Sequence, residues 1–181
     1  LEIDCPDFTE VRLDAVGICI RVPLLTQAAY PELVRRWIEG ALIAHQHKIS
    51  GRLIQGIISG STALNASGNF HSTIDSLGEL EQVAEYKRQE WRAPFSTTLE
   101  ILLPKWYRHV VRGDLARRRG VELTNVTDSE IDAHFANRGL RPQWLYNLNP
   151  LTQAGGVVST PAQIDVPMYL AGTWVKGTTD V

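Results

Sequence analysis

Apolar residues recur at intervals of mostly three and four positions between Tyr30 and Gly60, and this period predicts one long amphipathic helix. At about 1.5 Å per residue, such a helix would span about 45 Å. A compact domain of this chain length should be only about 35 to 40 Å across. The predicted apolar stripe consists of Val34, Ile38, Ala41, Leu42, Ile49, Leu53 and Ile57, widened by Trp37, Ile43 and Ile58. A helix as long as its own domain needs a functional explanation.

Three glycines lie inside this predicted helix, namely Gly40, Gly51 and Gly56. Each costs about 1 kcal/mol of helix stability relative to alanine. We therefore expect the helix to need tertiary or quaternary contacts. The missing side chains would also let another backbone approach closely.

The remaining patterns predict an alternation of strands, helices and polar loops. Residues 9–25 are rich in β-branched side chains and predict a strand or hairpin. Thr127 and Glu130 form a capping-box motif ahead of a short helix. Helices are predicted at 77–93, 105–120 and 129–139, strands at 96–104, 143–148 and within 164–181, and loops at 59–76 and 149–163. Strands and helices are interleaved without a regular βαβ repeat, so we predict an α+β fold with a central inserted subdomain.

Composition is that of an ordinary soluble domain. The chain has 181 residues, 44% of them hydrophobic, and a net charge of -2. A near-neutral balance argues against nucleic-acid binding through bulk positive charge, and the apolar runs are too short to span a bilayer. We expect Cys5 and Cys19 to be reduced thiols, half-buried on a strand, because nothing in the sequence indicates an oxidising compartment; a disulfide is the alternative. Most of the five tryptophans are expected in the core.

The ends of the sequence suggest a piece of a longer protein. The chain begins at Leu1 rather than at methionine, and it ends within a predicted strand, at Val181. We therefore expect segments on both sides of it.

The titratable residues do not form a recognisable catalytic or metal-binding motif. The histidines are His45, His47, His71, His109 and His134. His45 and His47 diverge by about 200° around a helix, whereas metal ligands on a helix are three or four positions apart. The sequence contains no nucleophile elbow, phosphate-binding loop, dinucleotide-binding fingerprint or zinc-protease motif. We predict no catalytic residue, cofactor or metal, and hence not an enzyme.

Charged side chains have plainer interpretations. Glu81 and Glu85, with Lys87 and Arg88, predict a salt-bridged solvent face of a helix. The basic cluster at 117–119 suits the negative end of a helix dipole. The alternative for this cluster is an electrostatic contact with a neighbouring subunit or a polyanion.

One segment resembles a known family. The sequence "LPKWYRHVVRGDLARRRGVELTNVTDSEIDAHFANRG", followed by "QWLYNL" and "YLAGTWVKGTTDV", looks like the major capsid protein of tailed bacteriophages of the group found in phages of actinobacteria. The opening "CPDFTEVRLDAVGICIRVPLLTQAAYPELV" resembles the same group. The similarity extends over nearly the whole chain, although no single motif in it is diagnostic.

The resemblance implies the HK97-like capsid fold. In that fold, residues 1–76 would form a peripheral domain whose spine helix is residues 30–60. Residues 77–163 would form the axial domain, and residues 164–181 would be return strands of the peripheral β-sheet. The long helix would then brace a thin tile. Relative to the family, an N-terminal arm, an extended loop and a C-terminal continuation are missing from this sequence.

The resemblance also implies a structural function. The chain would be a subunit of an icosahedral capsid, assembling with identical subunits into hexamers and pentamers that enclose double-stranded DNA without sequence-specific binding. Scaffold and portal proteins would be its partners, and the virion, assembled in the host cytoplasm, its location. The alternatives are an encapsulin-like nanocompartment shell protein and, from another class, an α+β enzyme or binding domain.

Overall fold

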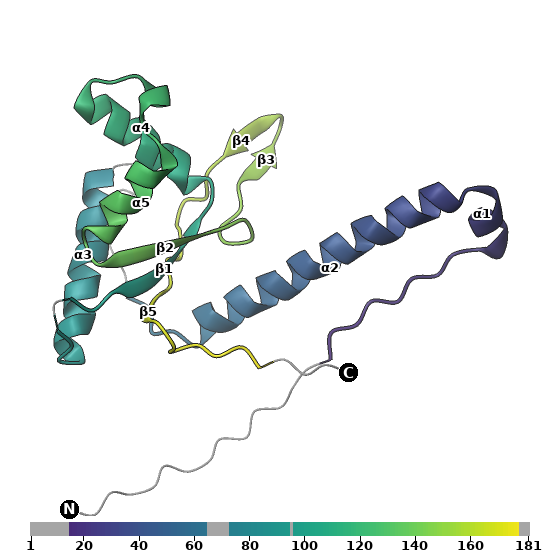
Figure 1. The fold of residues 1–181 in the computed structure, drawn as a ribbon, viewed down its shortest axis with the longest axis horizontal. Coiled ribbons are helices and arrows are strands. Elements are labelled where there is room, and N and C mark those ends of the chain that lie inside the picture. Colours follow the sequence, from purple (N-terminus) through teal and green to yellow (C-terminus); the bar gives the residue numbers. More distant parts are fainter. Residues whose placement is uncertain (1–14, 65–72, 95, 178–181) are drawn as a thin grey trace, which may run out of the picture. The chain divides into compact units, whose positions relative to one another are not determined.

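The computed structural model describes residues 15–64, 73–94 and 96–177 (Figure 1). The fold is mixed α+β, as predicted. The chain divides into two compact units, the first formed by Leu1–Ile49 with Val175–Val181 and the second by Ser50–Trp174. The boundary between them falls within the long helix.

The long helix is continuous. Helix α2 extends over Pro31–Ser59, which corresponds to about 43 Å and confirms the predicted long helix. Pro31 is its first residue, a position where the missing N–H costs nothing. The two units therefore share one uninterrupted helix.

The strand predicted at 9–25 is wrong for the part of it that the structure describes. Residues 15–23 have no regular structure, and Leu24–Ala29 forms helix α1. Pro23 is extended and immediately precedes α1, and the sequence after it, LLTQAA, is rich in good helix formers. Residues 9–14 lie outside the described residues.

The apolar stripe predicted for α2 is only partly covered. Val34, Ile38 and Ala41 are half-buried in the first unit, whereas Leu42 is exposed. The part of α2 that belongs to the second unit has one buried residue, Ile54, and the predicted stripe did not include it. Twenty positions separate Val34 from Ile54, which places their side chains about 200° apart around α2.

The second unit is built around strand β1, Leu99–Pro104. Strand β2, Leu140–Leu145, pairs with it in parallel, and β5, Met168–Leu170, pairs with it antiparallel on the other side. The strand predicted at 143–148 thus begins three residues earlier. Of the closing strands predicted within 164–181, the described residues contain β5, and its partner is β1 rather than an N-terminal strand.

Strand β1 is covered on both faces. Leu99, Ile101 and Leu103 pack with helices α3, Thr73–Glu90, α4, Tyr107–Arg119, and α5, Asp128–Ala136, which Figure 1 shows gathered beside the sheet. Leu102, on the opposite face, packs with Ile54 of α2 and with Leu148. Burial on both faces explains why this strand is apolar at every position except the half-buried Glu100. The larger core also contains Leu77, Ala84, Val111, Leu115, Ala116, Val126, Ile131, Phe135 and Leu140.

Helix ends follow their capping residues. Thr127 accepts a hydrogen bond from the Glu130 amide, and the Glu130 carboxylate accepts one from the Thr127 amide, so the predicted capping box is confirmed. Gly120 ends α4 with a φ of 64°, a left-handed conformation that favours glycine. A short 3-10 helix, η1, Leu123–Asn125, connects α4 to α5.

The loop predicted at 149–163 contains a β-hairpin. Strands β3, Thr152–Ala154, and β4, Val157–Ser159, pair antiparallel around Gly155 and Gly156. Both glycines have positive φ, 59° and 82°, which matches the type I′ turn that two-residue hairpins prefer. All residues of the hairpin are exposed, as predicted for the loop.

A buried arginine fastens α3 to the sheet. Arg88 is 5% exposed and donates from Nε to the Thr97 carbonyl at 3.1 Å and from Nη2 to the Gly139 carbonyl at 3.2 Å. Its Nη1 bonds to Glu85. Gly139 has a φ of 67°, and a Cβ there would lie 2.5 Å from Arg88 Nη2. The contact therefore requires both the arginine and the glycine.

Replacing this arginine should destabilise the protein strongly. In Arg88→Met the half-buried Thr97 carbonyl loses the side-chain donor that the structure gives it, and the Gly139 carbonyl keeps only the Leu99 amide. Together with the lost bond to Glu85, this should lower the free energy of unfolding by about 2 to 3 kcal/mol. Denaturant unfolding measures the change. The control is Arg35→Met, because the Arg35 side chain is 82% exposed and its pair with Glu39 should contribute less than about 1 kcal/mol. Equal losses in the two variants would contradict this account.

Two glycine substitutions should have opposite effects. A Cβ at Gly40 would meet nothing within 4 Å among the described residues, so Gly40→Ala should raise the free energy of unfolding by about 0.5 to 1 kcal/mol. Gly120→Ala should lower it by about 1 kcal/mol, because the left-handed conformation disfavours a Cβ. Thermal and denaturant unfolding test both, and destabilisation by Gly40→Ala would show that something packs against this position.

Candidate functional site

The densest charged cluster joins α4, α5 and β2. Arg108 Nη2 lies 2.7 Å from each carboxylate oxygen of Asp132, and Arg108 Nη1 lies 3.1 Å from Asp128. Trp144 Nε1 donates to Asp132 at 3.0 Å, and the Arg108 guanidinium lies 4.9 Å from the centre of the Trp144 ring. Arg112 also bonds to Asp128. These charges are already paired with one another, and the cluster functions as a clamp between three elements.

A shallow hollow of about 340 Å³ lies beside the clamp. Its charged residues, Arg112 and Asp128, are paired with each other, and the Thr127 hydroxyl caps α5. The remaining lining residues are Leu123, Thr124 and Val126. A second hollow, of about 390 Å³, lies in the first unit, where its charged residues, Arg35 and Glu39, form an ion pair. In the first hollow the Asp128 carboxylate is paired with arginines and the Thr127 hydroxyl accepts from the Glu130 amide, so neither is directed at the other as a base and nucleophile would be.

The basic turn at the end of α4 is largely paired. Arg118 bonds to Asp114 at 2.8 Å, and Arg119 lies 3.3 Å from Glu130 of α5. Arg117 is exposed. The position at the helix C-terminus agrees with the dipole interpretation. A contact of this turn with a neighbouring subunit or a polyanion stays a prediction.

The solvent face predicted for α3 is only partly correct. Lys87 pairs with Glu90 at 2.7 Å. Glu81 pairs at 2.9 Å with Arg138, which lies in the connection between α5 and β2. Arg88, in contrast, is buried and bonds to backbone carbonyls of other segments. The spacing of charges could not identify Arg88 as buried. It follows Glu85 by three positions, and the exposed Arg35 follows Glu32 by the same number.

The histidines are dispersed. His45 is half-buried on α2, His47 and His109 are exposed, and His71 lies outside the described residues. Within the described part of the chain, no three His, Cys, Asp or Glu residues are arranged to hold a metal ion. His134 lies in the last turn of α5, where its ring approaches Arg138.

The environment of His134 lowers its pKa below the usual 6.5. Burial is the main cause, and the neighbouring cations Arg138, Arg119 and Arg118 add to it, while Glu81 acts in the opposite direction. The unfolded chain therefore takes up the proton more readily than the folded one. Stability should fall as the pH drops through about 6.5.

Removing this histidine should flatten the acid side of the stability profile. In His134→Gln the free energy of unfolding should fall less steeply between about pH 7 and pH 5 than in the parent protein. Denaturant unfolding at several pH values measures the slope. Gln46→Asn, at an exposed position of α2 that carries no titratable group, is the control and should keep the parental slope. A parental slope in His134→Gln would contradict the proposed cause.

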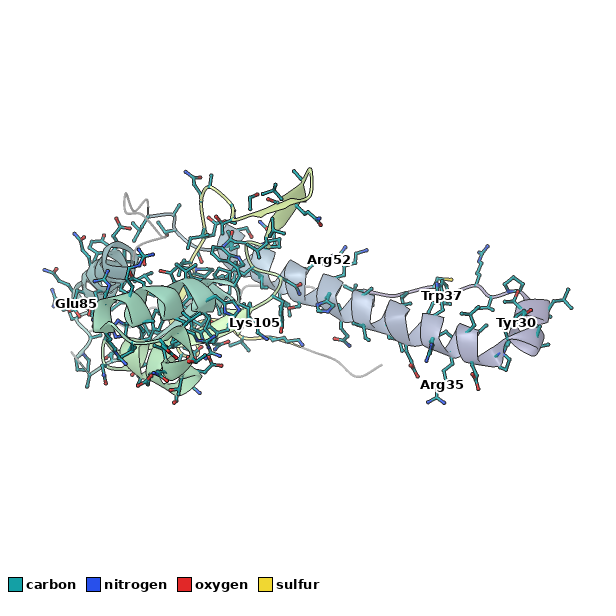
Figure 2. The ribbon with its side chains drawn as sticks, turned by 90° about the horizontal axis from the view of Figure 1, so that it is seen from above. Tyr30, Arg35, Trp37, Arg52, Glu85 and Lys105 are labelled. Carbon is teal, nitrogen blue, oxygen red and sulfur yellow. The ribbon has the colours of Figure 1, made fainter. Side chains whose placement is uncertain are left out.

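Large apolar side chains are exposed on the helices. Leu33 is 63% and Trp37 52% exposed, and the two lie four positions apart on one side of α2. Figure 2 marks Trp37 and Arg35 on this helix, with Arg35 extending away from it. Trp91 and Trp174 are also substantially exposed, so the expectation that most tryptophans are core residues is wrong for three of the five. Tryptophan on a surface is typical of protein–protein contacts.

The cysteine expectation is also corrected in part. Cys19 is a free thiol, as expected, but it is exposed and lies in a segment without regular structure rather than half-buried on a strand. Cys5 lies outside the described residues.

The hairpin is a second exposed apolar feature that the sequence analysis missed. Val157 is 67% and Val158 62% exposed. The pair Gly155–Gly156 between two short runs of strand-forming residues is a known hairpin signal and could have identified it. The candidate functional features are therefore surfaces, on α2 and on the hairpin, rather than a pocket.

Comparisons with known proteins identify no relative. No family model matches the chain, and no curated protein and no solved structure matches it either.

Within the residues that the structure describes, no helix is long and apolar enough to cross a membrane.

Proposed function

We propose that the chain is a structural subunit that assembles with identical copies into a closed shell, as a major capsid protein of HK97-like fold does. The observation that carries this proposal is α2, a continuous helix of 29 residues with large apolar side chains exposed on its surface. A helix of this length spans about 43 Å and can brace a thin subunit. The resemblance of the sequence to tailed-phage capsid proteins supports the same interpretation.

The exposed residues of α2 support assembly through energetics. Burying apolar surface is favourable by about 25 cal/mol per Å², so Leu33 and Trp37 would each stabilise a contact that covers them. Neighbouring residues on α2 are partly apolar too, including the exposed Leu42 and Ile43. Repeated heterologous contacts between identical subunits close into rings when the rotation between them permits it.

The content of the shell distinguishes the two versions of the proposal. In a virion the shell would enclose double-stranded DNA, and its net charge of -2 suits a wall that does not hold the DNA tightly. An encapsulin-like nanocompartment would share the same assembly and enclose proteins instead. An enzyme or binding domain would need a site with convergent reactive groups, and the two hollows described above are lined by groups already paired.

The oligomeric state in solution tests the proposal. We expect the protein to form rings or shells, measured by light scattering after size exclusion and by electron microscopy. The variant Leu33→Glu with Trp37→Glu should lose assembly and stay helical by circular dichroism, because two charges replace the apolar contact. The control, Gln46→Glu with Gln55→Glu, adds the same charge at exposed positions of α2 and should assemble normally.

Two results would contradict the proposal. One is a folded protein that stays monomeric at every concentration. The other is assembly that survives the Leu33 and Trp37 substitutions unchanged, because α2 would then not supply the contact.

A further inference from the structure

The hairpin β3–β4 extends beyond the sheet of the second unit (Figure 1). No helix or strand that the structure describes packs extensively on either of its strands. Isolated two-stranded hairpins are marginally stable in water. This hairpin is held by its glycine turn and by a contact of 3.0 Å between the hydroxyls of Thr152 and Ser159. Both of its outer edges are therefore open for pairing with another strand.

The open edges present specific backbone groups. In a hairpin with a two-residue turn, the residues next to the turn, Ala154 and Val157, exchange hydrogen bonds with each other. The next pair, Gln153 and Val158, does not, so its N–H and C=O groups point outward. One outer edge is thus centred on Gln153 and the other on Val158.

Charge does not protect these edges. Proteins usually place charged side chains on exposed edge strands to prevent pairing. Residues 149–164 contain no charged residue at all, and the valines at 157 and 158 are well suited to a strand interface. Pro150 and Pro161 flank the hairpin and cannot donate to a ladder, which limits pairing to the hairpin itself.

We infer that the hairpin is a contact between copies of this chain, with the β4 edge of one copy pairing with the β3 edge of the next. Around a rotation axis, the β3 strand of the next hairpin runs antiparallel to β4, so the up-and-down order continues from copy to copy. Val158 of one copy then faces Gln153 of its neighbour, and two backbone hydrogen bonds form at each contact. The β3 and β4 edges are both uncharged, so they meet without like-charge repulsion.

This inference rests on the proposed function, because it supplies one of the contacts by which the rings would close. Pairing edge to edge uses both sides of every hairpin, as a heterologous ring requires. A twofold contact between two β4 edges would use one side and leave the other open.

Cysteine cross-linking between two separate variants tests the arrangement. One protein carries Gln153→Cys and the other Val158→Cys, both with Cys5→Ser and Cys19→Ser so that each chain has a single thiol. One of the two also carries a size tag. Under mild oxidation, the mixture should give a cross-linked product containing one tagged and one untagged chain, and each variant alone should give little dimer.

The alternative results are distinguishable. Rings or shells without the mixed cross-link would overturn the hairpin contact and leave the proposed function intact. Monomers without any cross-link would overturn both. Efficient cross-linking of Val158→Cys with itself, or to a different protein co-purified from the cell, would overturn the head-to-tail pairing.

A charged substitution gives an independent measurement. Val158→Lys places a charge at the centre of the β4 edge and should reduce the assembled fraction to monomer while the circular dichroism spectrum is unchanged. Val175→Lys, at a valine that is 87% exposed outside the hairpin, is the matched control and should assemble as the parent does. Equal assembly of the two variants would overturn the inference.

Discussion

The burial of β1 on both faces is the constraint on which the second unit depends. A strand that carries buried leucine or isoleucine side chains on both faces cannot form one wall of a half-solvated sheet, so it needs a cover on each side. Helices α3, α4 and α5 supply one cover through Leu99, Ile101 and Leu103. The end of α2 supplies the other through Ile54. The long helix is therefore anchored to the sheet by the requirement that Leu102 be buried.

Charged and large apolar side chains are distributed differently over the chain. Charged side chains of α4 and α5 pair with one another, as the contacts of Arg108 with Asp132 and Asp128 illustrate. On α2 and the hairpin, large apolar side chains are exposed instead. Such a division is expected of a protein whose function is to be contacted by other chains, since interface cores are depleted of charge and enriched in aromatic residues.

Local rules in the sequence were sufficient for several of the regular elements. The period of apolar residues predicted α2, the capping box predicted the start of α5, and the strand predicted at 96–104 contains β1. The strand predicted at 9–25 is wrong at its end for a local reason, because Leu24–Ala29 consists largely of good helix formers and begins a helix directly after Pro23. Other predictions failed where tertiary contacts decide. The exposure of Trp37 and the burial of Arg88 depend on what lies opposite each side chain, which spacing along the chain does not record.

The candidate surfaces were harder to predict than the fold. A helix that is apolar on several sides has no single stripe, and Ile54 is buried although it lies about 200° around α2 from Val34. The hairpin carries a recognisable glycine pair. The absence of charged residues around it indicates a pairing surface only once the structure shows that its edges are open. For this reason the resemblance to capsid proteins led to a proposed function before any residue could be assigned to it.

The buried Arg88 also bears on the order in which the second unit folds. Its guanidinium connects α3 to carbonyls of two segments, and one of these, at Gly139, lies 51 positions further along the chain. If α3 docked before β2 was in place, the cation would be taken out of water with Glu85 and Thr97 as acceptors but without the Gly139 carbonyl, which is costly. Helix α3 precedes both β1 and β2 in the sequence but is thus expected to dock after this parallel strand pair has closed, so that synthesis order and folding order run in opposite directions.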